Sequence, residues 1–131
     1  MRIPRRDLVA LVAAGGMLGA LARYGLIEAI HTPAHGVPWV TFGVNLSGAF
    51  VLGAFSTITP AHAHRTRAFV AVGVLGAYTT FSTLAIETVL LMKAGRVGLG
   101  ISYLAGTIVI GLACAQVGVW CGRAVSVRGA Q

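Results

Sequence analysis

The sequence predicts an all-α integral membrane protein with four transmembrane helices. Of its 131 residues, 56% are hydrophobic and only 10% are charged, a composition that ordinary soluble domains do not have. Four long apolar runs make up most of the chain, and each is close to the roughly 20 residues that a helix needs to cross a bilayer. We therefore expect one four-helix transmembrane domain over residues 1–131, in a multi-pass protein of the cell membrane.

The four transmembrane helices are expected at about residues 8–30, 37–59, 68–92 and 97–122. The connections between them are short and hold the Pro, Gly, His or basic residues typical of a membrane boundary. In lipid, helices pack closely where small residues recur at four-residue spacing. Such pairs are Gly15 and Gly19, Gly43 and Ser47, and Gly118 and Gly122. Because four helices are too few to enclose a wide pore, we expect an oligomer.

The third span holds the most unusual stretch of the chain, the polar residues 76–83 (GAYTTFST) inside an apolar run. Gly73 and Gly76 weaken a helix at this point. Unwound backbone is tolerated at membrane depth only where it is buried in protein or lines a cavity. We therefore expect the third helix to be broken near its middle.

Basic residues are distributed unevenly, within a net charge of +7. With the N-terminus in the cytoplasm, only Lys93 and Arg96 flank the spans on the outer side. The basic residues on the inner side are Arg2, Arg5, Arg6, Arg65, Arg67, Arg123 and Arg128. This bias is the one that orients membrane proteins. We expect no nucleic-acid binding, since no basic face carries interleaved aromatic residues, and no enzyme activity, since no catalytic arrangement is visible.

Three polar side chains lie in or near the apolar runs, Arg23, Asn45 and Glu87. An ionised group inside a membrane costs several kcal/mol unless it faces protein or water, so such residues suggest a functional site. Helical spacing gives the second and third spans one polar face each. These faces comprise Thr41, Asn45 and Gly48, and Thr80, Thr83 and Glu87.

The two polar faces have two possible partners. They can hydrogen-bond to each other across the helices, which alone would retain Asn and Thr here. Alternatively, they form a narrow polar track of amide, hydroxyl and guanidinium donors. Donors and the electropositive edges of aromatic rings, without a ring of acidic residues, favour anions over cations.

Three stretches resemble the signature sequences of the Fluc/CrcB fluoride channels: residues 16–24 (GMLGALARY), residues 41–53 with Asn45 and Gly48, and residues 73–83. The most specific of these is Gly-x-x-Gly-x-x-Thr-Thr-Phe-Ser-Thr in the third. The resemblance implies an antiparallel, dual-topology-type dimer that passes fluoride through two narrow pores and exports it from the cell. It also implies a central structural Na⁺ that is not transported, held by the backbone carbonyls of Gly76 and Thr79.

The resemblance further assigns the residues of the fluoride pore. It implies that Asn45 is a fluoride ligand and that Phe81 turns a ring edge to the anion. Thr80, Ser82 and Thr83 are the hydroxyl candidates, with Thr41 on the polar face of Asn45. Arg23 corresponds to a basic residue near the aqueous vestibule. Glu87 corresponds to a carboxylate beside the path, which cannot bind fluoride while ionised.

The chain departs from the family pattern at Leu84, where a second phenylalanine is usual. Either one ring per pore is enough here, or another subunit supplies a complete set. A chain that forms an antiparallel homodimer inserts in both orientations and so has little charge bias, whereas this chain has a strong one. A homodimer and a heterodimer with an oppositely oriented homologue therefore both stay open.

Two other functions are consistent with four short spans. A small multidrug exporter couples protons to a cationic drug through a membrane-embedded carboxylate, but Glu28 lies near a span end and Glu87 lies beside hydroxyls. A subunit without transport activity would use Asn45 and the threonines only to hold helices together. We expect a fluoride channel.

Overall fold

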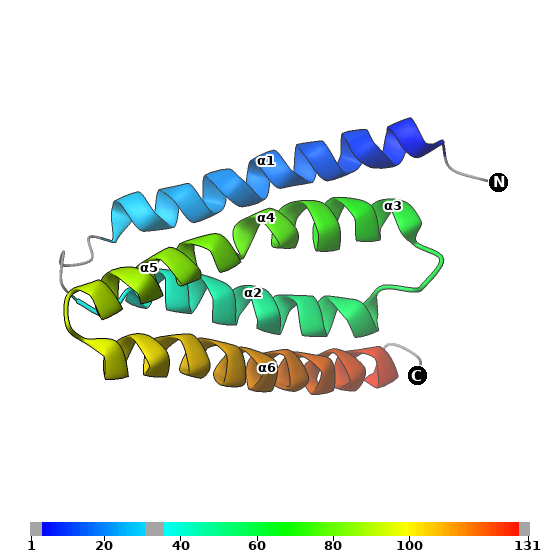
Figure 1. The fold of residues 1–131 in the computed structure, drawn as a ribbon. Helices are drawn as coiled ribbons and strands as arrows, with labels where there is room; N and C mark the ends of the chain where they lie inside the picture. The colour runs from blue at the N-terminus through cyan, green and yellow to red at the C-terminus, as the bar shows by residue number, and fades with distance from the viewer. Residues whose placement is uncertain (1–3, 31–35, 129–131) are drawn as a thin grey trace.

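The computed structural model describes residues 4–30 and 36–128. The chain forms four passes that run side by side (Figure 1). The first two passes are α1 (Arg5–Ala29) and α2 (Trp39–Ile58). The third consists of α3 (His64–Arg67), η1 (Ala68–Leu75), α4 (Gly76–Tyr78) and α5 (Phe81–Lys93), and the fourth is α6 (Val97–Arg128).

The four passes have the length and composition of membrane spans. Arg5–Ala29, Trp39–Ile58, His64–Lys93 and Val97–Val127 are each apolar enough to cross a bilayer as a helix. The predicted all-helical class with four apolar helices is thus confirmed. The last helix continues past the expected end at residue 122, as far as Arg128.

Local sequence explains where several helices begin and turn. The first two start directly after Pro4 and Pro38, where the missing proline N–H costs nothing because the first N–H groups of a helix have no partner within it. Between α5 and α6, Gly95 adopts φ 78°, a conformation that glycine reaches without steric cost. That residue allows the tight reversal between the third and fourth passes.

The third pass is broken in its middle, as the sequence predicts. Residues 68–75 form a wide π-helical segment, which is uncommon at this length. Thr79 (φ −75°, ψ 155°) and Thr80 (φ −146°, ψ 120°) are then extended before α5 resumes at Phe81. Figure 1 shows the resulting change of direction between α4 and α5.

Close contacts between helices occur where the sequence places glycine. α1 packs against η1 and α4, and α2 packs against α6. A Cβ added at Gly19 would overlap the Val74 carbonyl, and one at Gly122 would overlap the Thr57 hydroxyl. The prediction of close helix packing is wrong for Gly43 within the subunit, because a Cβ there would meet no atom within 4 Å.

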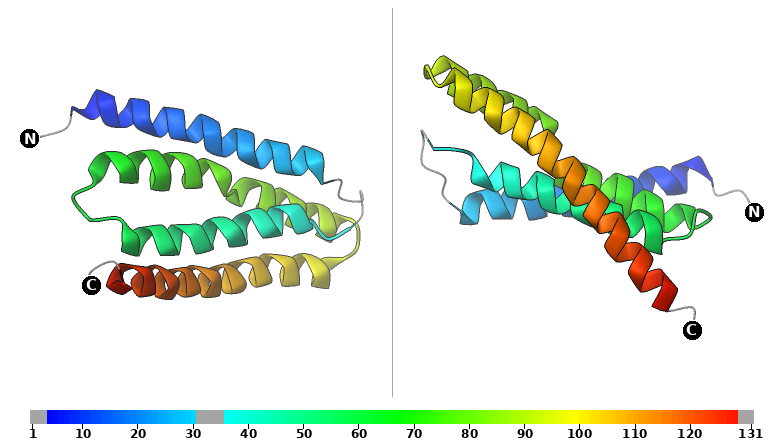
Figure 2. Two further views of the ribbon diagram at one scale, coloured as in Figure 1. Left: turned by 180° about the vertical axis from the view of Figure 1, so that it is seen from behind. Right: turned by 90° about the horizontal axis from the view of Figure 1, so that it is seen from below.

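The two ends of the bundle differ in charge. The start of α1, α3 and the end of α6 lie at one end, and the turn between α5 and α6 lies at the other (Figures 1 and 2). Arg65 forms an ion pair with Asp7 (3.5 Å), which ties the first and third passes together at the first end. Arg123 lies near the same end, whereas Lys93 and Arg96 lie at the opposite one. Arg2 lies outside the described residues.

Candidate functional site

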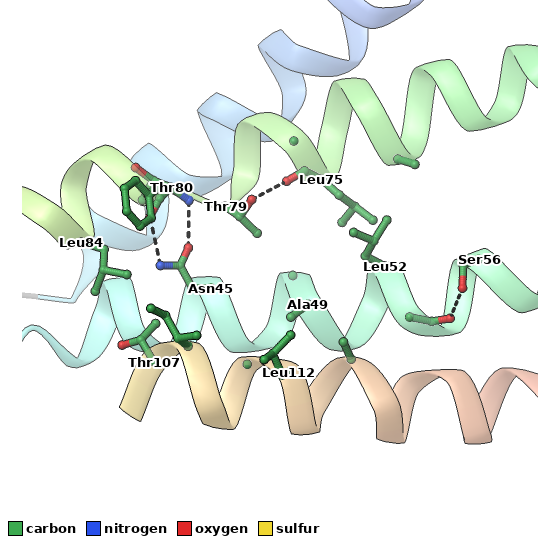
Figure 3. A pocket seen from close by; sticks show the side chains of 18 residues that line it. Asn45, Ala49, Leu52, Ser56, Leu75, Thr79, Thr80, Leu84, Thr107 and Leu112 are labelled. Carbon is green, nitrogen blue, oxygen red and sulfur yellow. Dashed lines mark hydrogen bonds between the residues drawn. The ribbon is translucent and has the colours of Figure 1, made fainter. Parts of the chain in front are cut away.

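A groove with a volume of about 530 Å³ runs between α2, the broken third pass and α6 (Figure 3). Most of its lining is apolar, with hydroxyl and amide groups near the helix break. Two lining residues, Phe81 and Leu112, are about 70% exposed (71% and 69%), so the groove opens on the surface of the subunit. Its polar lining residues are Asn45, Ser56, Thr79, Thr80 and Thr107.

Asn45 reaches from α2 to the break in the third pass. Its Oδ1 accepts a hydrogen bond from the Thr80 N–H (2.8 Å), and its Nδ2 donates one to the Thr80 carbonyl (3.0 Å). Figure 3 shows this pair of bonds across the groove. An unpaired backbone group at membrane depth costs several kcal/mol, so Asn45 satisfies both polar groups of an extended residue. One N–H of the amide is left for another acceptor.

The Thr80 hydroxyl is bound within the subunit. It accepts the Thr83 N–H (3.1 Å) and so caps α5, and it donates to the Thr83 hydroxyl oxygen (2.9 Å). Ser82 Oγ lies 3.3 Å from the same hydroxyl. Thr80 is buried, whereas Thr83 is half-buried and Ser82 is exposed. The structure therefore brings all three predicted hydroxyls together at the start of α5.

Phe81 and Leu84, one turn apart on α5, have opposite environments. Phe81 projects at the surface, while Leu84 is only 3% exposed and packs with Leu91 and Tyr103. Both residues line the groove. At the position where the resemblance implies a second ring, this chain thus has a side chain that belongs to the core of the subunit.

Glu87 is held by two hydroxyl groups from neighbouring helices. Thr41 on α2 donates to its Oε1 (2.8 Å), and Tyr103 on α6 donates to its Oε2 (2.7 Å). Both donors are buried. The predicted faces of the second and third spans therefore meet, in part by direct hydrogen bonding between the helices.

The other predicted residues, Arg23, Gly76 and Thr79, take no part in the contacts described above. Arg23 is half-buried on α1 and is not among the residues that line the groove. Gly76 and Thr79 line the groove on the side of the break, and the Thr79 hydroxyl donates to the Leu75 carbonyl (3.1 Å). The structure thus gathers the predicted residues of α2 and the third pass, and leaves Arg23 separate.

Sequence reasoning missed Tyr103 and Thr107, both on α6. The sequence does hold a signal for Tyr103. Glu87 lies eight residues before Gly95, and Tyr103 lies eight residues after it. Two antiparallel helices joined by a tight turn bring such positions to the same level. Thr107 lines the groove, but its hydroxyl donates to the Tyr103 carbonyl, and no sequence signal marks it.

The chain is similar to known proteins over most of its length. Residues 10–119 match the family model of the CrcB-like proteins, described as Camphor Resistance (CrcB). The chain is 43% identical over 122 residues to fluoride-specific ion channel FluC 1 of Streptomyces coelicolor, a match that covers 90% of this chain and 79% of that protein. It is 42% identical over 118 residues to a fluoride-specific ion channel FluC of Thermus thermophilus, covering 88% and 94%. Fluoride-specific ion channel FluC 1 of Mycobacterium bovis is 40% identical over 133 residues, covering 96% and 99%.

Proposed function

Because the chain belongs to the CrcB-like family, whose relatives above are fluoride-specific ion channels, we propose that it is a fluoride channel of the cell membrane. Fluoride leaves the cell passively through it, down its electrochemical gradient, and cytoplasmic fluoride falls. The observation that carries this proposal is the cluster of hydrogen-bond donors at the helix break, beside an exposed aromatic ring in an apolar groove. Such a lining favours a small anion.

Asn45 and Phe81 are the principal fluoride-contacting residues in this proposal. The second N–H of the Asn45 amide is available to the anion, because the first donates to Thr80. Phe81 offers a ring edge, and its exposure leaves it free to do so. Ser82 and Thr83 have hydroxyls at the same level. Thr80 contributes mainly by shaping this turn, since its hydroxyl already donates to Thr83.

Glu87 and Thr41 lie beside the path in this account. Both carboxylate oxygens of Glu87 accept hydrogen bonds from hydroxyls, so the group acts as a fixed acceptor. These two bonds hold Glu87 against α2 and α6, away from the groove that Asn45 and Phe81 line. Arg23, on α1 and outside the groove, adds positive charge that attracts anions to the subunit.

The path is completed by a second subunit. The groove is lined by three passes of this chain but opens at Phe81 and Leu112, so one subunit does not enclose it. We assign the missing wall to an antiparallel partner. The excess of arginine at one end of the bundle favours a single orientation of this chain, and therefore a homologous partner of opposite orientation over a second copy.

The sodium ion implied by the family fits the backbone at the break. The proposed ligands are the carbonyls of Gly76 and Thr79, and hard cations take oxygen ligands of this kind, as in other interrupted membrane helices. Within residues 4–30 and 36–128, the Thr79 carbonyl accepts no hydrogen bond from the backbone. Such an ion supplies positive charge that satisfies carbonyls freed from the helix.

Fluoride efflux from proteoliposomes, followed with a fluoride electrode, tests this function. The full-length chain is reconstituted alone and then with a homologue encoded beside it. We expect efflux only with the homologue, and rapid efflux by the chain alone would establish the homodimer instead. Absence of fluoride efflux from both preparations, with correctly folded protein, would contradict the proposed function.

A further inference from the structure

The break in the third pass replaces two specific helical hydrogen bonds. In an uninterrupted α-helix each N–H donates to the carbonyl four residues earlier. The Thr80 N–H would therefore bond to the Gly76 carbonyl, and the Thr83 N–H to the Thr79 carbonyl. Instead, Thr80 N–H donates to Asn45 Oδ1 (2.8 Å), and Thr83 N–H donates to Thr80 Oγ1 (3.1 Å).

We propose that Asn45 and Thr80 are positioning residues for the central cation site, because their side-chain oxygens accept the two N–H groups that would otherwise occupy the Gly76 and Thr79 carbonyls. The inference rests on the proposed function, which assigns those carbonyls to sodium. It adds residues that touch no cation but control the cation ligands. It also gives Asn45 a second task besides contact with fluoride.

Through the geometry of the peptide group, Asn45 also sets the direction in which the Thr79 carbonyl, a proposed sodium ligand, points. The Thr79 carbonyl and the Thr80 N–H belong to one planar peptide, and no described residue has a cis peptide bond. In a trans peptide the C=O and N–H point in opposite directions. Because Asn45 fixes the Thr80 N–H, it also turns the Thr79 carbonyl away from α2.

Asparagine supplies both groups that the backbone of Thr80 needs. Thr80 offers one backbone donor and one backbone acceptor, and the short amide of Asn45 meets both. These partners fix which atom of the amide is oxygen and which is nitrogen. Aspartic acid in its neutral form keeps the same two bonds but has no further proton to donate. The two tasks of Asn45 can thus be separated by one substitution.

For Thr80, the hydroxyl oxygen is the group that matters. Serine keeps this oxygen as the cap of α5, whereas valine has nearly the same shape as threonine and lacks it. Because the two side chains have nearly the same shape, valine fits this buried site sterically. After the change to valine, the Thr83 N–H has the Thr79 carbonyl as its nearest alternative acceptor.

The test measures how sodium stabilises the full-length protein, together with its partner subunit if one is required. Thermal unfolding is followed as NaCl replaces N-methylglucamine chloride at constant ionic strength, which gives the sodium concentration of half-maximal stabilisation. We expect Asn45→Ala and Thr80→Val to raise this concentration by about tenfold, since a backbone hydrogen bond then competes with the ion for each carbonyl. Thr80→Ser should leave it near the wild-type value, as should Asn45→Asp at a pH at which the new carboxyl is neutral.

Fluoride efflux by the same proteins separates the two tasks of Asn45. Asn45→Asp is expected to keep sodium-dependent stabilisation while losing efflux, and Asn45→Ala to lose both. An unchanged sodium midpoint in Asn45→Ala and Thr80→Val, or no sodium dependence in the wild type, would overturn the inference. A different result would contradict the proposed function itself, namely the absence of fluoride efflux from the wild-type protein. If Asn45→Ala does not assemble, the Thr80→Val and Thr80→Ser pair decides.

Discussion

Among single residues, Phe81 has the proposed role that can be tested most directly. It begins α5 directly after the break, and its ring is largely exposed in the groove. Because Phe81 lines the groove beside the hydrogen-bond donors at the break, its exposed ring can turn an edge to an anion there. Leu84, one turn later, cannot replace it because it packs inside the subunit.

We predict that Phe81→Ile reduces fluoride efflux to the rate of protein-free liposomes and leaves assembly intact. Isoleucine keeps an apolar side chain at the surface but has no electropositive ring edge to turn to the anion. Phe50→Ile is the matched control, since Phe50 is an exposed ring on α2 that does not line the groove. Equal efflux from the two variants would remove Phe81 from the fluoride path.

At the scale of residues, the types of polar side chain were predictable and their partners were not. Helical spacing placed Thr41 and Asn45 on one face, and both do meet the third pass. The sequence did not indicate that Asn45 would bond the backbone of Thr80, because that contact depends on the relative height of two helices 35 residues apart along the chain. Hydrogen bonding between helices, the alternative to a polar track, is present for both residues.

The elements of the bundle are held in register by glycines, and α1 shows this most clearly. Gly15 and Gly19 bring the helix backbone against the carbonyls of Phe69 and Val74 in η1. Since η1 leads directly into the break, the contact supports the position of the whole third pass. Gly25, farther along the same helix, has no such neighbour.

We predict that Gly19→Ala destabilises the folded protein by about 1–3 kcal/mol, the usual cost of overpacking a tight interior contact. Its Cβ would overlap the Val74 carbonyl, which as backbone cannot rotate away. Gly25→Ala, in contrast, should be neutral or slightly stabilising, because alanine is the better helix former. Unfolding of both variants in detergent with increasing SDS is the measurement, and a similar midpoint for both would contradict this account of the packing.

The position of the helix break was only partly predictable. Gly73 and Gly76 indicated a weak helix near the middle of the third pass, and the break does occur there. The extended residues, however, are Thr79 and Thr80, not the glycines. Glycine weakens the helix and so favours an interruption, but the position of the break depends on which carbonyls find donors, and which N–H groups find acceptors, on α2.

The distribution of charge over the whole molecule favours one orientation of the chain in the membrane. The arginines at the start of α1, in α3 and at the end of α6 lie at one end of the bundle, and Lys93 and Arg96 lie at the other. Arginine and lysine near short loops set the orientation in which helices insert. The structure therefore places the charge bias of the sequence at a single end of the bundle.

We predict that the chain inserts with its C-terminus in the cytoplasm. A C-terminal reporter that is fluorescent only in the cytoplasm, compared with one active only outside, measures the orientation. Neutralising Arg5, Arg6 and Arg65 together should shift the population toward both orientations. Equal signals from the two reporters in the wild-type chain would instead support a dual-topology homodimer.

The whole assembly is expected to conduct fluoride and to exclude chloride, the commoner halide. Liposomes loaded with equal concentrations of potassium fluoride and potassium chloride, with valinomycin to carry potassium, allow both anions to be followed in one experiment. We predict that fluoride leaves at a rate set by the protein, while chloride stays inside as it does in protein-free liposomes. Release of both anions together, or retention of both by a folded assembly that includes the partner subunit, would contradict this prediction.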